Sequence, residues 1–300
     1  MSDYSVRPKH IIDAHTHIFE EEYREKYIED TFSIDFATEL NFRRGADGTL
    51  DDLSKSADEN GIAKYFILPV VKDPRKIERI NDFYYNESKR DERAVFCGNL
   101  HPNHPRLDEI LADLKSKNAR MIKLHSVFQR FNITSRQSLK FFEKISDMGF
   151  PVIFDTSRVP PKHLTNDDLP EYYANPSKLL KLHDILPNLE IIAAHGGGLF
   201  IYDFERRNLI DSGIYIELSS SYYNCDWPRN DHDVSLDNFL YMLNNHNQEK
   251  LLFGTDTPWQ FQKYEIEKFV KLHETGKITK EQLENIFWKN ANSLFDLGLE

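Results

Sequence analysis

Two histidines separated by one residue follow a short apolar stretch near the start of the chain. The stretch is residues 11–14 (IIDA), and His15 and His17 come directly after it. Because side chains alternate between the two faces of a strand, both imidazoles point to the same side. Together they can reach one divalent cation, which binds several nitrogen or carboxylate ligands at about 2.0–2.2 Å. The pair indicates a metal site, provided that other parts of the chain supply further ligands.

Four further segments combine a short apolar run with an ionisable side chain at its end. Burying such a side chain is costly unless it pairs with another group or binds a metal. If the runs are neighbouring strands whose ends share one rim, these groups gather there around a cation or in a tight polar network. The candidate residues at these strand ends are Lys123 and His125, Asp155, His195, and Asp256.

Short apolar runs recur along the chain, separated by charged segments with helical periodicity. Nearly continuous apolar strands with helices between them are typical of a parallel sheet covered on the outside by helices. The predicted strands are His10–Ala14, Tyr65–Val70, Ala94–Asn99, Met121–Leu124, Val152–Asp155, Glu190–Ala194, Ile214–Leu218 and Leu251–Gly254. The predicted helices are Leu50–Asn60, Pro74–Lys89, Arg106–Lys117, Ser135–Met148, Pro176–Leu186, Leu199–Asp211, Ser235–Asn247 and Gln262–Thr275, with a last one at Lys280–Phe295.

Eight strand–helix units in a chain of 300 residues predict a single-domain (β/α)8 TIM-like barrel over residues 1–300. An open doubly wound sheet is the alternative, but the glycine-rich phosphate turn typical of its first strand is absent from this sequence. Long loops, Phe19–Thr49 and Arg158–Asn175, follow the first and fifth strands. In a compact domain such loops are usually lids or binding loops. In a barrel, they would lie at the face that holds the active site.

Composition narrows the class of protein. No apolar run is long enough for a membrane span, and the first residues do not have the pattern of a secretory signal. The net charge of −11, without a basic stripe, argues against nucleic-acid binding. Two cysteines, Cys97 and Cys225, are too few for a disulfide framework and suit a reducing cytoplasm. A cytoplasmic enzyme acting on a small molecule fits these observations, and the exposed aromatics make a homodimer plausible.

The motifs together resemble the amidohydrolase superfamily, in its amidohydrolase-related branch of aminocarboxymuconate-semialdehyde decarboxylase-like enzymes. They are H-T-H at residues 15–17, K-L-H at 123–125, A-H-G-G-G from residue 194 and G-T-D-T-P from residue 254. The resemblance implies a distorted barrel with one divalent metal, usually zinc. It assigns His15, His17 and Asp256 as metal ligands. His195 would lie beside the metal, where it binds the metal or polarises the substrate or the metal-bound water.

One departure from the family pattern concerns the fifth strand, where the family places a ligating histidine. This chain has Asp155 there. Asp155 could replace the histidine, since carboxylate oxygen is an acceptable zinc ligand and such a site would also tolerate Mn²⁺ or Mg²⁺. Alternatively, His125 on the neighbouring strand becomes the ligand. In the third alternative the metal is lost and a polar network remains.

With a metal present, the first expectation is a hydrolase acting on an amide, ester or lactone carbonyl of a small molecule. A metal lowers the pKa of bound water to roughly 7. Asp256 would take the proton of that water and His195 would stabilise the oxyanion. Lys123 could bind a substrate carboxylate or be a structural ion-pair partner, and His125 could contact substrate or orient a ligand.

Two other functions remain open from the sequence. The first is non-oxidative decarboxylation of an aromatic or unsaturated acid, which needs nearly the same parts. Arginines in the loops would bind the carboxylate and aromatic residues would line a wall for a ring, unless they only pack against the barrel. The second is a metal-free barrel without catalysis. The loop residues in question are Arg43, Arg44, Arg130, Arg158, Tyr222, Tyr223, Trp227 and Trp259.

Overall fold

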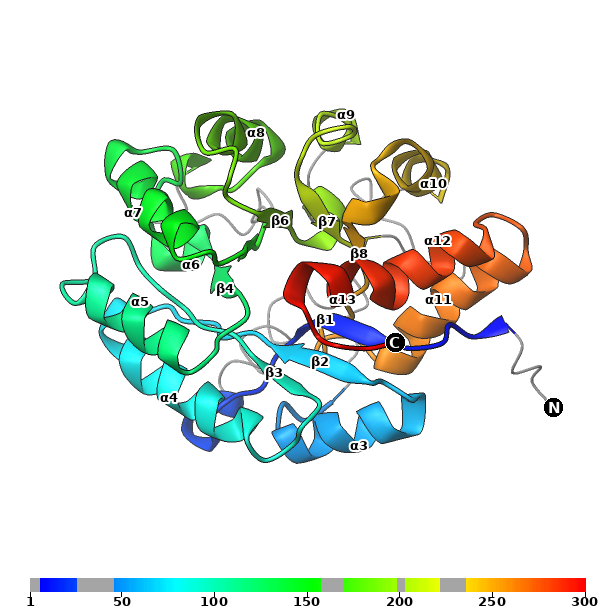
Figure 1. The fold of residues 1–300 in the computed structure, drawn as a ribbon, viewed down its shortest axis with the longest axis horizontal. Helices are drawn as coiled ribbons and strands as arrows, with labels where there is room; N and C mark the ends of the chain where they lie inside the picture. The colour runs from blue at the N-terminus through cyan, green and yellow to red at the C-terminus, as the bar shows by residue number, and fades with distance from the viewer. Residues whose placement is uncertain (1–5, 26–45, 158–169, 199–202, 222–235) are drawn as a thin grey trace.

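The computed structural model of the chain describes residues 6–25, 46–157, 170–198, 203–221 and 236–300. Within these ranges, short strands alternate with helices, and the helices surround the strands (Figure 1). The strands are β1 (Ile12–Thr16), β2 (Lys64–Ile67), β3 (Ala94–Phe96), β4 (Ile122–Leu124), β5 (Val152–Phe154), β6 (Ile191–Ala193), β7 (Tyr215–Glu217) and β8 (Leu251–Leu252). Each of them lies within, or overlaps, the strand that the sequence predicts.

All strand pairs are parallel and follow the order of the chain. β1 to β3 form one sheet and β4 to β8 form a second. Two parallel bridges join the sheets, one between Gly98 and Ile122 and the other between Thr16 and Thr257. A hydrogen bond of 2.9 Å from the amide of Lys123 to the carbonyl of Gly98 strengthens the first seam. The strands therefore follow one another around an α/β barrel of the TIM type, as predicted.

The helices alternate with the strands and form the outer layer of the barrel (Figure 1). The predicted helix at 199–211 is described only from residue 203, and the last predicted helix contains one π-helical turn, Asn285–Lys289. The helices are α3 (Leu50–Asn60), α4 (Ile77–Ser88), α5 (Leu107–Ser116), α6 (Ser126–Gln129), α7 (Arg136–Asp147), α8 (Pro176–Ile185), α9 (Asp203–Arg207), α10 (Leu236–Asn245), α11 (Gln262–Glu274), α12 (Lys280–Glu284) and α13 (Asn290–Phe295).

Local sequence signals explain where individual helices begin and end. At the start of α3, the Thr49 side chain accepts a hydrogen bond from the amide of Asp52, and at its end Gly61 adopts a left-handed conformation. At the start of α8, Asn175 accepts from the amide of Lys178, and Pro176 occupies the first helical position. Such caps satisfy backbone groups that the helix itself leaves unpaired.

The core lies between the strands and the surrounding helices, and one end of it is closed by the C-terminal helices. The Phe253 and Phe287 rings stack with centroids 4.4 Å apart, and Phe66 contacts Phe295 at 4.5 Å. The first and last quarters of the chain therefore pack on each other. In the ranges that the structure describes, no helix is both long and apolar enough to cross a membrane. The central parts of both predicted long loops, residues 26–45 and 158–169, lie outside these ranges.

Candidate active site

β1 positions the histidine pair as the sequence predicts. His15 lies in the strand and His17 follows it, and the Nε2 atoms of their buried side chains are 3.1 Å apart. The Nδ1 atom of His17 donates a hydrogen bond to the carbonyl of Leu68 at 2.8 Å. A neutral imidazole that donates through Nδ1 presents a lone pair at Nε2. The two Nε2 atoms are therefore oriented as acceptors toward a common point.

The loop after β8 brings Asp256 to the same point. The amide of Asp256 donates to the carbonyl of His15 at 2.8 Å, which fixes the loop against β1. The Oδ1 atom of Asp256 lies 3.2 Å from Nε2 of His17 and 3.6 Å from Nε2 of His15. The backbone of Asp256 is left-handed, with φ of 62°, which is uncommon outside glycine. Residues at opposite ends of the sequence thus meet at one rim.

These three side chains fit a divalent cation. Two imidazole nitrogens and one carboxylate oxygen suit zinc or manganese, and ligand atoms of His15, His17 and Asp256 all lie within 4.8 Å of one another. Lone pairs that face each other across 3.1 Å repel unless a positive charge lies beside them. The ammonium of Lys123, buried on β4, lies 3.3 Å from Nε2 of His15 and supplies part of that charge.

Ionisation favours metal binding at this point. Burial and the charge of Lys123 lower the pKa of His15 well below its usual value, which leaves its ring neutral. Burial alone would raise the pKa of Asp256, but the contacts with His17 and His15 outweigh it, so that the pKa is lowered. A neutral imidazole and an ionised carboxylate are the forms that bind a metal.

Asp155, at the end of β5, lies among side chains of the neighbouring strands. Its Oδ2 atom is 3.3 Å from Nε2 of His195 and 3.9 Å from Nζ of Lys123, and its Oδ1 atom is 3.6 Å from Nε2 of His125. Ligand atoms close enough to share an ion occur in two groups of the described residues, and Asp155 is in neither of them. A ligand role for Asp155 or His125 stays a prediction.

The contact with Asp155 favours a protonated His195. Burial lowers the pKa of His195, but the hydrogen bond to Asp155 and the charge of Asp256 outweigh it and raise the pKa above its usual value. Burial raises the pKa of Asp155, but the neighbouring His125, His195 and Lys123 hold it well below its usual range. Burial lowers the pKa of His125 to about 4, despite the charge of Asp155. The contact with Asp155 therefore favours the protonated form of His195.

Sequence reasoning missed two buried residues that link His15 and His195 through hydrogen bonds. Glu217, the last residue of β7, accepts a hydrogen bond of 2.7 Å from Nδ1 of His15. Ser219 contacts both Glu217 and His195, at 2.9 and 3.0 Å from its Oγ atom. Burial raises the pKa of Glu217, and the charge of His195 and hydrogen bonds from Ser219 lower it in part. The signal was present, because the seventh predicted strand also carries an acidic residue near its end.

Of the loop aromatics and arginines that the sequence suggested as substrate contacts, Trp259 and Arg130 lie within the described residues. Trp259 makes edge-to-face contacts with His17 at 5.2 Å and with Phe19 at 5.4 Å, so it borders the metal ligands. Arg130 is exposed at the end of α6. The other proposed loop residues lie outside the described ranges: Arg43, Arg44, Arg158, Tyr222, Tyr223 and Trp227.

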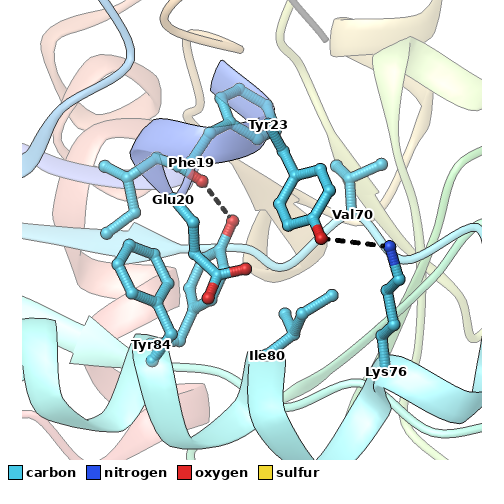
Figure 2. Close-up of a pocket in the computed structure, with 9 residues that line it drawn as sticks. Phe19, Glu20, Tyr23, Val70, Lys76, Ile80 and Tyr84 are labelled. Atoms are coloured by element: carbon cyan, nitrogen blue, oxygen red, sulfur yellow. Dashed lines mark hydrogen bonds between the residues drawn. The ribbon is translucent and has the colours of Figure 1, made fainter. Parts of the chain in front are cut away.

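A pocket lies beside the site, where the segment after β1 packs on α4 (Figure 2). Figure 2 shows the hydroxyl of Tyr23 directed toward the amine of Lys76, 3.2 Å away, across from Ile80 and Tyr84. The carboxylate of Glu20 in this pocket is paired with Arg79 at 2.8 Å. None of the candidate metal ligands lines the pocket, which thus borders the site without containing its chemistry.

A comparison with protein families assigns the class of this barrel. The sequence model of the amidohydrolase family matches residues 12–297. The chain therefore belongs to the amidohydrolase family, a family of enzymes, and this agrees with the resemblance drawn from its motifs. A non-catalytic barrel, the third possibility raised by the sequence, has no support from this assignment.

Among curated proteins, residues of this chain align with the decarboxylase OrsB of Emericella nidulans at 26% identity over 135 residues. The alignment covers 39% of this chain and only 37% of that relative's length.

Solved structures share the fold over nearly the whole chain. A dihydroxybenzoic acid decarboxylase from Polaromonas sp. JS666, with bound manganese and an inhibitor, has a TM-score of 0.69 at 16% identity and covers 97% of this chain and 98% of its own. A 5-carboxyvanillate decarboxylase from Novosphingobium aromaticivorans, complexed with manganese, has a TM-score of 0.71 at 14% identity, with coverage of 97% and 99%. An uncharacterized TIM-barrel protein from Bordetella bronchiseptica reaches 0.72 at 17% identity, with coverage of 95% and 98%. At such identities the likeness concerns the fold.

Proposed function

We propose that this chain is a metal-dependent, non-oxidative decarboxylase of an aromatic or unsaturated carboxylic acid. The observation that carries the proposal is the position of His195. Its Nε2 atom lies 3.3 Å from the Asp155 carboxylate, and its ring centroid is 5.0 Å from that of the candidate ligand His15. A proton donor thus lies next to a metal-binding group, and decarboxylation needs both.

Hydrolysis, the first expectation from the sequence, uses nearly the same side chains. Relatives support decarboxylation better, because OrsB and the two manganese-containing structures described above carry that activity in their names. The raised pKa of His195 also suits decarboxylation, in which carbon must receive a proton after carbon dioxide leaves.

In the proposed reaction, some side chains bind the substrate and another supplies the proton. When bound, a divalent cation supplies positive charge that holds anionic oxygens of the substrate. Lys123 and His125, which face Asp155 across the rim, bind and orient the substrate carboxylate. The bond between the carboxyl carbon and its neighbour breaks, and the electron pair stays on that neighbour. His195 then donates the proton from Nε2 to this carbon, and carbon dioxide is released.

Manganese is the metal that we propose first, because the two similar decarboxylase structures hold it. Zinc, the expectation from the sequence, uses the same donor atoms. A harder site with Asp155 as a fourth ligand would accept Mg²⁺ as well. We also propose that the protein acts in a reducing cytoplasm, consistent with a buried, unpaired Cys97.

Carbon dioxide release tests the proposed reaction. Manganese-loaded protein would be incubated with 2,6-dihydroxybenzoate and 5-carboxyvanillate, the acids that similar structures name, and with a broader panel of hydroxybenzoates and unsaturated acids. We expect one carbon dioxide per acid consumed, and one deuterium on the vacated carbon when the reaction runs in D₂O. Chelator-treated protein is the control.

The same assay separates decarboxylation from hydrolysis. The probe for hydrolysis is the lactone 2-pyrone-4,6-dicarboxylate, because another similar structure is named as a probable hydrolase of this compound. Ring opening of this lactone, or cleavage of an ester or amide, without carbon dioxide release from any acid of the panel would overturn the proposal and restore hydrolysis as the function.

A further inference from the structure

We infer that Glu217 is the positioning residue of this site, which fixes the metal-binding histidine His15 directly and the proton donor His195 through Ser219. The inference rests on the proposed function, since it takes His15 as a metal ligand and His195 as the proton donor. In this assignment Glu217 binds neither the metal nor the substrate, although its carboxylate also lies within 4.8 Å of ligand atoms of His15 and His195. Its effect on both runs through its hydrogen bonds.

The contact with His15 sets the tautomer and the direction of that ring. Oε2 of Glu217 accepts from Nδ1 of His15 at 2.7 Å, on the side of the ring opposite to His17 and Asp256. A histidine whose Nδ1 carries the shared proton presents the Nε2 lone pair to a metal, and the carboxylate makes that nitrogen more basic. Removal of such a partner typically costs 10–100-fold in metal affinity.

The contact with Ser219 extends the same control to His195. Oγ of Ser219 donates to Oε2 of Glu217 at 2.9 Å and lies 3.0 Å from Nδ1 of His195. Because its hydroxyl hydrogen points to the carboxylate, the serine oxygen is left to accept from Nδ1 of His195. The backbone amide of His195 is also directed at Glu217, 3.3 Å from Oε2. His195 can then direct Nε2 toward Asp155 and the substrate.

The surroundings of Glu217 argue against a merely structural ion pair. Its side chain is completely buried, and the ion pair that the described residues provide for it is with His15. Glu265, another buried carboxylate of the chain, is paired with Lys268 at 2.7 Å. Burying a carboxylate without a lysine or arginine is costly, and hydrogen bonds to the histidines and Ser219 offset that cost. The donors therefore define where the carboxylate lies.

Gly254 makes room for this arrangement. A Cβ atom on residue 254 would lie 2.2 Å from Oε1 of Glu217 and 2.8 Å from Cβ of His15, far closer than atoms can approach. The absence of a side chain at this position lets the segment after β8 pass directly beside the contact between Glu217 and His15. The glycine of the G-T-D-T-P segment thus has a steric role in the placement of Glu217.

Manganese binding to the apoprotein tests the inference without a substrate. Free Mn²⁺ would be followed by its electron paramagnetic resonance signal as it is titrated into the unmodified protein, Glu217→Gln and Glu217→Asp. Glutamine keeps the shape of the side chain, but its NH₂ group donates hydrogen bonds where the carboxylate accepts them from His15 and Ser219. Aspartate keeps the charge but is one methylene too short for the 2.7 Å contact with His15. We expect both variants to bind Mn²⁺ 10–100-fold more weakly than the unmodified protein.

Two further variants separate positioning from general damage. Glu265→Gln removes a buried carboxylate that pairs with Lys268 instead of a candidate metal ligand, although its charge is also felt by Asp256. Its Mn²⁺ affinity should fall far less than that of Glu217→Gln. Ser219→Ala should lower kcat more than Mn²⁺ affinity, because His195 loses its 3.0 Å contact with Ser219, whereas His15 loses only a 3.3 Å contact and keeps its 2.7 Å hydrogen bond to Glu217. Circular dichroism at the assay temperature verifies that each variant is folded.

Each outcome bears on the inference. Folded Glu217→Gln with the Mn²⁺ affinity of the unmodified protein would overturn it, as would a Glu217→Asp protein that binds as tightly. A loss of Mn²⁺ affinity in Glu265→Gln as large as in Glu217→Gln would also overturn it, because removal of any buried carboxylate would then weaken metal binding. Absence of decarboxylation would sink the proposed reaction but leave the Mn²⁺ titration to decide the role of Glu217. Absence of Mn²⁺ binding by the unmodified protein would overturn both.

Discussion

At the scale of single residues, the most distinctive side chain is Asp155. A carboxylate stands where the resemblance drawn from the sequence motifs implies a ligating histidine, and it lies between His195, His125 and Lys123. These contacts hold the pKa of Asp155 well below its usual range. Asp155 thus contacts the proton donor and the substrate-binding groups of the proposed mechanism. We therefore predict a larger effect of Asp155 on catalysis than on metal affinity.

Substitution of Asp155 tests this assignment. Asp155→Asn should lower kcat by 10-fold or more, because His195 loses the charge that keeps its proton, while Mn²⁺ affinity stays close to that of the unmodified protein. Isothermal titration with Mn²⁺ and steady-state kinetics measure the two effects. A drop in Mn²⁺ affinity of about 10-fold or more, as expected for loss of a group that holds the metal, would instead make Asp155 a ligand.

The proton donor allows a second test at this scale. His195→Gln should lower kcat by about 10²–10⁴-fold, the usual contribution of a positioned general acid. The metal content of the purified variant should not change, because His15, His17 and Asp256 remain. Metal analysis of the variant by mass spectrometry, beside its kcat, gives the answer. Loss of the metal together with activity would place His195 among the ligands, as one version of the sequence-based expectation had it.

At the scale of elements, partly buried polar contacts connect neighbouring strands outside the active site. Asp91, in the loop before β3, accepts hydrogen bonds from Ser54 of α3 at 2.6 Å and from Tyr65 of β2 at 2.7 Å, and it pairs with Arg93 at 2.7 Å. Burial raises the pKa of Asp91, but the hydrogen bonds from Arg93 and Ser54 outweigh it, so that the pKa is strongly lowered. One carboxylate thus links a helix to two strands.

The lowered pKa of Asp91 predicts how stability depends on pH. A carboxylate with a lower pKa in the folded than in the unfolded state stabilises the fold above its unfolded pKa and loses this contribution as pH falls through the folded value. Asp91→Asn should destabilise the protein at pH 7 by about 1–3 kcal/mol. The difference from the unmodified protein should narrow below about pH 4.

Urea unfolding at several pH values measures this effect. A matched control is Asp58→Asn, because Asp58 is exposed and contacts the same Arg93 at 2.5 Å. It should change stability far less than Asp91→Asn, since exposed ion pairs contribute little. A constant difference between Asp91→Asn and the unmodified protein from pH 7 to pH 3 would contradict the prediction.

At the scale of the whole molecule, the candidate metal site lies on the seam where the barrel closes. His15 and His17 come from the first strand and Asp256 from the loop after the last, and the amide of His17 donates to the carbonyl of Thr257 at 2.7 Å across that seam. A cation held there joins the two ends of the sequence. Because these ligands meet only in the folded chain, metal binding and folding are coupled.

Metal removal should therefore lower the stability of the entire barrel. A ligand that binds the folded state alone stabilises it by about 2.7 kcal/mol at a free concentration of about 100 times Kd. We expect Mn²⁺ to raise the unfolding midpoint of the apoprotein in a concentration-dependent manner, and to leave that of His15→Ala almost unchanged. Calorimetry with and without a chelator measures both. Equal shifts in the two proteins would place the stabilising metal elsewhere.

The calorimetric experiment also tests two predictions about organisation. One domain over residues 1–300 predicts one cooperative transition that shifts as a whole with metal. Independent transitions for two parts of the chain would contradict a single domain. The predicted homodimer would appear as a doubled mass in light scattering, and binding to nucleic acid is not expected at a net charge of −11.

The sequence by itself determined the elements and most of the chemistry they carry. Short apolar runs with an acidic or basic residue at the end predicted the strands, their parallel order and the rim on which His15, His17, His195 and Asp256 meet. This succeeded because strand burial and side-chain alternation are local properties. The same pattern around Glu217 was present but not used, since one acidic residue near a strand end is equally consistent with a helix cap or an exposed side chain.

Only the tertiary structure decided which of these side chains contact one another. Asp155 follows β5, which is separated from β1 by β2, β3 and β4 but pairs directly with β6, the strand before His195. Its position in the barrel therefore directs it to the proposed proton donor. Glu217 reaches His15 because Gly254, which lies against both residues, has no side chain. Such contacts depend on the order and spacing of strands around the ring, and no local sequence pattern encodes them.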